Sequence, residues 1–331
     1  MLRFVSSLST VSRETGGQLG GALVGVPASG AVPPWPVQRV FAPLLGSTSP
    51  VVHETWLVDG PLTSGRGEDI HWRRNGGLLY GVIDLDEVDF RGGPDCSPLQ
   101  AASAEAYRRI FRLLDAQGVP HLWRAWNYLP RINLETHGLE RYRQFNIGRQ
   151  DAFVDCHRSS TGNVPAACAI GLVGGTLSIA FLAGEVPAVP IENPRQISAY
   201  NYPADYGPRS PTFSRATLAR IGGQELLFIS GTASIVGHQT VHSGDAAGQC
   251  RESLANIAAV VTEASRQAQR AFVLPELSYR VYIRNAGDFP AVRAVMEATV
   301  GAAEIVYLQA DICRADLLLE IEAYASHLQE N

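Results

Sequence analysis

The chain has 331 residues, of which 46% are hydrophobic and 18% are charged, and its formal net charge is −5. This is enough for two ordinary domains or one large one, and the lack of a basic block argues against a nucleic-acid or anionic-membrane surface. The 27 basic residues are all Arg, which excludes a Schiff-base or P-loop lysine and leaves guanidinium groups to bind anions.

The five cysteines are scattered and form no C-x-x-C pair, as expected for reduced thiols rather than a disulfide framework or a zinc site. His238 and His242 lie four residues apart without a third ligand nearby, so no metal site is expected. The apolar run in residues 1–6 is too short for a signal peptide, and no stretch approaches a membrane span. We therefore expect a soluble, cytoplasmic protein.

Residues 1–65 are rich in Gly, Pro and Ser, with short apolar runs at 21–26, 38–43 and 51–58. These runs can form edge strands or cover a face of a sheet.

From residue 67 onward the pattern is clearer. Asn75-Gly76 joins two strand-like runs and is a strong hairpin signal. A helix is predicted at 98–117, with a capping box that begins at Ser97 and a proline at its first position. The remaining elements predicted for this half are a strand at 121–128, a helix at 137–152, and strands at 166–173 and 176–183.

Residues 192–211 contain three Tyr, two Arg and four Pro. Such a stretch is too rich in turn formers for a regular element, and it is more aromatic than a plain linker. We interpret it as a stiff binding loop.

The second half repeats the order of the first. Its predicted elements are strands at 212–220 and 224–230, helices at 246–270 and from Asp288, and strands at 278–284, 303–309 and 315–323. Both halves therefore follow the order ββαβαββ, and both first hairpins carry a Gly-Gly pair. The repeat predicts two copies of one α+β unit packed together, with a cleft between them as the natural place for a site.

The last strand places two carboxylates within an apolar run. Its alternation puts Leu317, Leu319 and Ile321 on one face, and Leu318, Glu320 and Glu322 on the other. One interpretation is an edge strand whose polar face meets water. The other is a carboxylic acid in a low-dielectric pocket, with its pKa raised so that it can donate a proton.

The segment Leu319-Glu320-Ile321-Glu322-Ala323 resembles the last strand of the reactive-intermediate deaminase (YjgF-like) fold. That resemblance implies two tandem YjgF/Rid-like (chorismate-mutase-like) ββαβαβ units. Members that hydrolyse imines carry an arginine on the preceding strand, whereas 303–309 here contains none. Simple imine deamination is therefore not expected.

A closer resemblance covers most of the chain. Four separated segments are similar in sequence and order to the chorismatases: 145–149, 196–215, 229–234 and 313–320. Chorismatases split chorismate or use it to make hydroxybenzoates, and they carry two such units in one chain. The resemblance implies unit boundaries at 1–190, with extra N-terminal strands, and 191–331, which bears the catalytic glutamate.

The chorismatase resemblance also implies roles for individual residues. Glu320 matches the catalytic acid, Arg149 and Arg215 match the arginines that clamp the substrate's carboxylates, and Tyr142 and Tyr202 match the tyrosines that bond to it. The chemistry is consistent with this set, because chorismate is a dianion with two separated carboxylates. Protonation of its enol ether needs a positioned acid but no metal or redox cofactor.

Three choices stay open. Tyr200 and Tyr206 are alternatives to Tyr202. Two units in one chain favour a monomer, although an exposed sheet face would permit a dimer. The product also depends on subtype. One chorismatase group hydrolyses the ether to a dihydroxycyclohexadiene carboxylate and pyruvate, another gives 3-hydroxybenzoate and pyruvate, and a third gives both 3- and 4-hydroxybenzoate.

Two residues favour the 3-hydroxybenzoate group. That group typically has Gly in the Ser-x-Thr segment and Cys seven residues before the acid, where the hydrolytic group tends to have Ala. This chain has Gly231 and Cys313, so we predict 3-hydroxybenzoate and pyruvate, with Gly231 at the substrate and Cys313 in catalysis. The alternative from another class is a non-catalytic small-molecule binder, which would need the Arg and Tyr residues but not Glu320.

Overall fold

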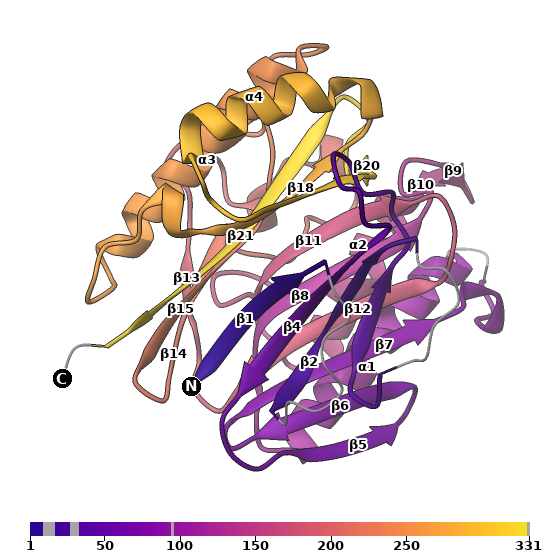
Figure 1. Ribbon diagram of the computed structural model, residues 1–331. Coiled ribbons are helices and arrows are strands. Elements are labelled where there is room, and N and C mark those ends of the chain that lie inside the picture. The colour runs from indigo at the N-terminus through magenta and orange to yellow at the C-terminus, as the bar shows by residue number, and fades with distance from the viewer. Residues whose placement is uncertain (9–16, 27–32, 94–95, 330–331) are drawn as a thin grey trace.

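The computed structural model describes residues 1–8, 17–26, 33–93 and 96–329. Three β-sheets enclose the central core, and two pairs of helices cover the outer faces of the two larger sheets (Figure 1). Within the described parts of the chain, no helix is both long and apolar enough to cross a membrane.

The first half forms a seven-stranded sheet in the order β20-β11-β8-β12-β7-β6-β5. Its strands are β5 (Thr63–Gly67), β6 (Ile70–Asn75), β7 (Leu78–Leu85), β8 (His121–Pro130), β11 (Ala166–Leu172), β12 (Leu177–Gly184) and β20 (Asp311–Ile312). Helices α1 (Pro98–Ala116) and α2 (Arg141–Asp155) pack on one face. As predicted, Ser97 caps α1, its hydroxyl accepting a hydrogen bond from the Gln100 N–H at 3.1 Å.

The second half forms a six-stranded sheet in the order β13-β14-β15-β21-β18-β19. Its strands are β13 (Val189–Ile191), β14 (Ala216–Ile221), β15 (Gln224–Thr232), β18 (Ser278–Ile283), β19 (Ile305–Gln309) and β21 (Leu319–Leu328). Helices α3 (Ala246–Ser265) and α4 (Phe289–Val300) cover its outer face, at the top of Figure 1. A short ribbon of β16 (Ile235–Val236) and β17 (Gln239–Thr240) follows β15.

The two sheets repeat one topology. The order β11-β8-β12-β7-β6 in the first corresponds strand by strand to β19-β18-β21-β15-β14 in the second. In each, the first of these pairs is parallel and the rest are antiparallel. Two-residue Gly-Gly turns close both first hairpins, at 76–77 and 222–223. The predicted α+β class with two tandem units is confirmed.

The N-terminal residues form a third sheet of four strands, in the order β1-β4-β2-β3. Its strands are β1 (Leu2–Ser7), β2 (Gln18–Gly25), β3 (Val37–Val40) and β4 (Val51–Val58). Trp56 on β4 lies 6.0 Å from the Trp126 ring of the first sheet and 5.9 Å from the Phe228 ring of the second, measured between centroids. The third sheet therefore closes the core between the two repeats.

Several element boundaries differ from the prediction. β14 begins at Ala216 rather than 212, and β21 extends to Leu328 rather than 323. Two other boundaries are shifted by a local turn. Residues 135–140 form a small hairpin, β9 (Glu135–Thr136) and β10 (Leu139–Glu140), so α2 begins at Arg141 rather than at 137. His137 and Gly138 have φ angles of 53° and 71°, which a right-handed helix cannot contain. The last strand begins at Leu319 rather than 315, because residues 314–317 form a turn.

The late start of β21 changes the predicted faces. Leu319 and Ile321 share one face, as predicted, and pack under α3 and α4. Leu317, which precedes the strand, instead packs in the core between the sheets, and Leu318 packs on the side of α3 and α4 rather than with the glutamates. The edge-strand interpretation is wrong, because β21 lies between β15 and β18 in the sheet. Glu320 and Glu322 are 4% and 5% exposed on its inward face.

Helix α3 ends at Ser265, five residues before the predicted 270. The boundary between units at 190/191 stays a prediction. β13 spans it and pairs with β14, while β20 from the second half pairs with β11 of the first sheet.

Gly148 lets α2 approach α1. A Cβ at this position would collide with the backbone carbonyl oxygen of Gln100 on α1. We expect Gly148→Ala to lower the free energy of unfolding by about 1–3 kcal/mol, because the two helices must separate. Urea unfolding measures this. Gly287→Ala, where a Cβ meets no atom within 4 Å, is the matched control, and equal stability of the two variants would contradict the prediction.

Candidate active site

A cavity of about 850 Å³ lies between the two repeats. Its walls come from β9, β10, α2 and β11 of the first repeat and from the 202–215 loop, β15 and the turn before β21 of the second. All seven residues singled out from the sequence line it: Tyr142, Arg149, Tyr202, Arg215, Gly231, Cys313 and Glu320. The roles assigned to them remain predictions, but the structure brings them together.

Glu320 lines this cavity at a point where the neighbouring strand β15 is irregular. Between Ile229 and Thr232, β15 carries one residue more than the facing stretch of β21, which is a β-bulge. The bulge places Gly231 directly against the Glu320 carboxyl, so that a Cβ at residue 231 would overlap Glu320 Oε1. Only a residue without a side chain leaves the carboxyl in this position.

The surroundings of Glu320 favour its neutral form. Burial raises its pKa to about 8, the nearby Glu322 carboxylate adds to the rise, and Arg124 opposes it. The Cys313 thiol lies 3.8 Å from Glu320 Oε2, and burial holds the pKa of this thiol well above its usual range. At pH 7 Glu320 is therefore a carboxylic acid with a proton to donate.

Arg149 lies on α2 and is 1% exposed. Its Nη2 donates a hydrogen bond to Asn146 Oδ1 at 2.9 Å, and its guanidinium lies 5.0 Å from the Phe145 ring centroid. Its Nε is buried without a partner among the described residues. Tyr142, one turn of α2 earlier than Phe145, lines the same wall, and burial raises the pKa of its hydroxyl.

Arg215 immediately precedes β14 and is 4% exposed. Its Nη2 donates to Tyr202 Oη at 2.7 Å and to the Ile197 carbonyl at 2.8 Å. The 192–211 loop is thus fastened to this arginine, and its Tyr202 side chain is presented to the cavity. Of the two alternatives, Tyr206 also lines the cavity, whereas Tyr200 is not among its lining residues.

The sequence did not single out Arg314, which lines the same cavity next to Cys313. Its guanidinium lies 4.0 Å from the Tyr206 ring centroid and 5.1 Å from that of Tyr202. Its Nη1 donates to the His238 carbonyl at 2.9 Å, and its Nη2 is buried without a partner in the described part of the chain. A loop arginine has no periodic signal, so only its neighbours in space identify it.

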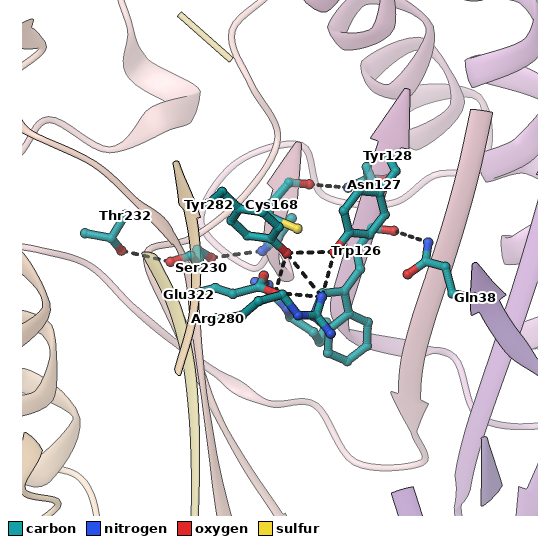
Figure 2. Close-up of polar contacts among 12 residues, drawn as sticks. Gln38, Trp126, Asn127, Tyr128, Cys168, Ser230, Thr232, Arg280, Tyr282 and Glu322 are labelled. Atoms are coloured by element: carbon teal, nitrogen blue, oxygen red, sulfur yellow. Dashed lines mark hydrogen bonds and ion pairs between the residues drawn. The ribbon is translucent and has the colours of Figure 1, made fainter. Parts of the chain in front are cut away.

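Glu322 is anchored in a polar network behind Glu320. Figure 2 shows it together with Arg280 and Tyr282 of β18 and Tyr128 of β8. Tyr282 donates to Glu322 Oε1 at 2.7 Å, and Arg280 Nη1 lies 3.0 Å from the same oxygen. Arg124 of β8 bonds the other oxygen. Such complete pairing is what a buried charge requires.

His238 and His242 contact different neighbours. His238 Nδ1 lies 3.1 Å from Tyr206 Oη, and His242 lies 3.6 Å from Glu252. Among the residues that the structure describes, no group of three or more His, Cys, Asp and Glu side chains is arranged to hold a metal ion. All five cysteines are free thiols.

A neutral carboxylic acid beneath a cavity lined by four arginines, Arg143, Arg149, Arg215 and Arg314, is a site for general-acid chemistry on an anionic substrate. Residues 54–183 match the family model described as chorismatase FkbO/Hyg5-like, N-terminal. A chorismatase from Streptomyces rapamycinicus is 38% identical over 278 residues, which is 81% of this chain and 80% of that protein. A 3-hydroxybenzoate synthase from Streptomyces hygroscopicus is 38% identical over 292 residues, 84% and 83% of the two chains.

A crystal structure of a chorismatase superposes with a TM-score of 0.86 at 34% identity, covering 98% of each chain. The chain belongs to the chorismatase family. The resemblance to chorismatases inferred from the four sequence segments is confirmed, and the structure contains one α+β unit twice.

The raised pKa of Glu320 makes stability depend on pH. The unfolded carboxyl releases its proton near pH 4.5, whereas the folded one holds it up to about pH 8. Glu320 therefore contributes most to the stability of the folded protein below pH 4.5. This contribution is lost as the pH rises to 8, and the free energy of unfolding falls by at most about 1.4 kcal/mol per pH unit. We expect urea midpoints to fall more from pH 5 to 8 in the wild type than in Glu320→Gln; parallel curves would contradict this.

Proposed function

We propose that the chain converts chorismate to 3-hydroxybenzoate and pyruvate, with Glu320 as the acid that protonates the enolpyruvyl methylene carbon. The observation that carries this proposal is the position of Glu320 between Gly231 and Cys313. One carboxyl oxygen occupies the space that a side chain at residue 231 would fill, and the other faces the thiol. The two residues that distinguish the subtypes thus both contact the acid.

The cavity lining includes the acidic residues Glu135, Glu140, Asp205 and Asp316 as well as four arginines, and it is the unpartnered arginine nitrogens that support an anionic substrate. Arg149, Arg215 and Arg314 each have one buried nitrogen without a partner among the described residues. Such donors are costly to bury unless a ligand completes their hydrogen bonds. Two carboxylates on one ring would do so, and we assign Arg149 and Arg215 to them, one from each repeat. Tyr202 and Tyr142 orient the ring between these arginines.

The reaction begins with a proton transfer to carbon. Glu320 donates its proton to the terminal methylene, which turns the side chain into an oxocarbenium-like leaving group. The substrate's own 4-hydroxyl then attacks C3 and the C3–O bond breaks, so pyruvate departs with the ether oxygen. The proton that the hydroxyl loses returns to the Glu320 carboxylate. The remaining oxide opens by breaking its C4–O bond, the C3 proton is lost to water and the oxygen on C3 takes up a proton from water, so the sum of products equals chorismate without net addition of water.

Gly231 and Cys313 favour this route over hydrolysis for a steric reason. A methyl group at 231 would displace the carboxyl and the substrate ring with it. The sulfur of Cys313, 3.8 Å from Glu320 Oε2, fills the space where a small residue would admit water. Because its pKa is raised, the thiol stays protonated and can donate to the carboxylate that forms.

The products test the proposal directly. Purified protein incubated with chorismate should release equimolar pyruvate and 3-hydroxybenzoate, separated by liquid chromatography. In ¹⁸O-water, with pyruvate reduced at once to lactate, the lactate should carry no label, because the ether oxygen leaves with it. Labelled lactate and a non-aromatic diol would show hydrolysis instead, and 4-hydroxybenzoate would point to the mixed subtype. No pyruvate at all would favour the non-catalytic binder.

Removal of the acid tests its role. Glu320→Gln keeps the size of the side chain but has no proton to give, so we expect kcat to fall by about 10²–10⁴-fold. Chorismate affinity, measured by calorimetry, should stay within a few-fold, because the arginines are intact. Glu225→Gln alters another buried carboxylate that is distant along the sheet and should retain activity. A near wild-type rate in Glu320→Gln would overturn the mechanism.

The subtype residues make a separate prediction. Gly231→Ala combined with Cys313→Ala should shift the product ratio from 3-hydroxybenzoate toward the dihydrodiol, since water gains access and the carboxyl is displaced. Liquid chromatography gives the ratio. Gly287→Ala with Cys156→Ala, both remote from the cavity, is the matched control. An unchanged ratio in the first double variant would show that these residues do not select the product.

A further inference from the structure

Two glutamates on one strand face have opposite surroundings. Glu320 and Glu322 both project inward from β21 and are 4% and 5% exposed. Glu322 is bonded by two guanidinium groups and by the Tyr282 hydroxyl. Glu320 has only the Cys313 thiol within hydrogen-bond distance among the described groups. Because their environments differ, Glu320 is the carboxyl that holds a proton and Glu322 is the one that stays charged.

The two buried arginines near Glu320 form ion pairs with other carboxylates. Arg280 bonds Glu54 of β4 as well as Glu322, so it bridges the third sheet to β21 (Figure 2 shows its contacts with Glu322 and Tyr282). Arg124, on β8, is 2% exposed and bonds Glu322. The charges of these four groups cancel. Arg124 lowers the pKa of Glu320, but its charge is paired with Glu322 and only partly offsets the rise caused by burial.

The other titratable groups around the pair come from every element packed against it. They are Tyr128 on β8, Cys168 on β11, Tyr279 and Tyr282 on β18, Arg215 before β14, Tyr142 and Arg149 on α2, Glu140 on β10, Cys313 and Arg314 before β21, Tyr80 on β7, Tyr324 on β21 and Glu304 before β19. Burial raises the pKa values of Tyr128, Tyr282 and Cys168, so these groups are neutral at pH 7. Arg124 is thus the buried cation whose pairing with Glu322 decides whether Glu320 keeps its proton.

We propose that Glu322 is a positioning residue for the reaction: by holding Arg124, it withholds that cation from Glu320 and keeps the acid in its proton-bearing form. The proposal rests on the assignment of Glu320 as the acid. An unpaired guanidinium at Arg124 would attract the ionised Glu320 carboxylate and so lower the pKa of Glu320. Arg124 would also no longer be held in place by Glu322. Glu322 does not line the cavity; it acts on Glu320 through its pairing with Arg124 and through its own negative charge.

Opposite shifts of the pH profile test the proposal. Glu322→Gln frees Arg124, so the alkaline limb of kcat for pyruvate release should move down by about one to three pH units. Arg124→Met leaves Glu322 paired with Arg280 and Tyr282 and removes the cation, so the limb should stay or move up. Glu225→Gln, a buried carboxylate paired with Arg220 at the other end of the sheet, should leave the limb unchanged.

A purely structural role predicts a different result. It would lower kcat of Glu322→Gln equally at all pH values, with the limb unmoved, and that result would overturn the proposal. Equal downward shifts in Glu322→Gln and Arg124→Met would overturn it as well. If Glu322→Gln does not fold, Arg124→Met alone decides, since a downward shift in that variant contradicts the withholding of the cation.

A second measurement does not depend on turnover. The infrared band of a protonated carboxyl that is present in the wild type and lost in Glu320→Gln reports the proton on Glu320. With increasing pH, this band should disappear earlier in Glu322→Gln than in the wild type. If chorismate is not turned over, the proposed function fails, but this titration still tests the effect of Glu322 on the proton of Glu320. A band that does not shift in Glu322→Gln would reject the inference even if the enzyme is active.

Discussion

The structure depends on one constraint: two carboxylates lie on the inward face of the central strand of a sheet, in a space closed by three sheets. A buried charge must be paired or neutralised. Glu322 satisfies this by bonding Arg124, Arg280 and Tyr282, and Glu320 satisfies it by keeping its proton. The same burial that would destabilise two charged carboxylates thus leaves Glu322 as a paired anion and Glu320 as a neutral carboxylic acid.

The repeat supplies the geometry for this arrangement. Because each half builds its own sheet and helices, the inward faces of β8 and β21 meet across the core, and residues from both halves converge on one cavity. Arg149 comes from the first repeat and Arg215 from the second. The N-terminal sheet adds Glu54, which completes the pairing of Arg280. Duplication therefore gives the cavity two unlike walls, one from each repeat.

The fold was largely predictable because its signals are local. The hairpin at 75–76, the capped helix from 98 and the repeated order of elements follow from turn chemistry and apolar spacing. The errors arose where backbone conformation overrides spacing, as at His137, whose positive φ delays α2. They also arose at the 314–317 turn, which shifts the start of β21.

By itself the sequence determined which residues are available for chemistry: an acidic pair at 320 and 322, arginine as the sole strong cation, and motif positions at 231 and 313. It could not decide whether Glu320 meets water or a cavity, because exposure depends on which strands flank β21. Only the tertiary structure placed Arg124 beside Glu322, 198 residues away, and Gly231 against the acid. Electrostatic environment is set by distances in space, so the proton on Glu320 follows from the fold rather than from any motif.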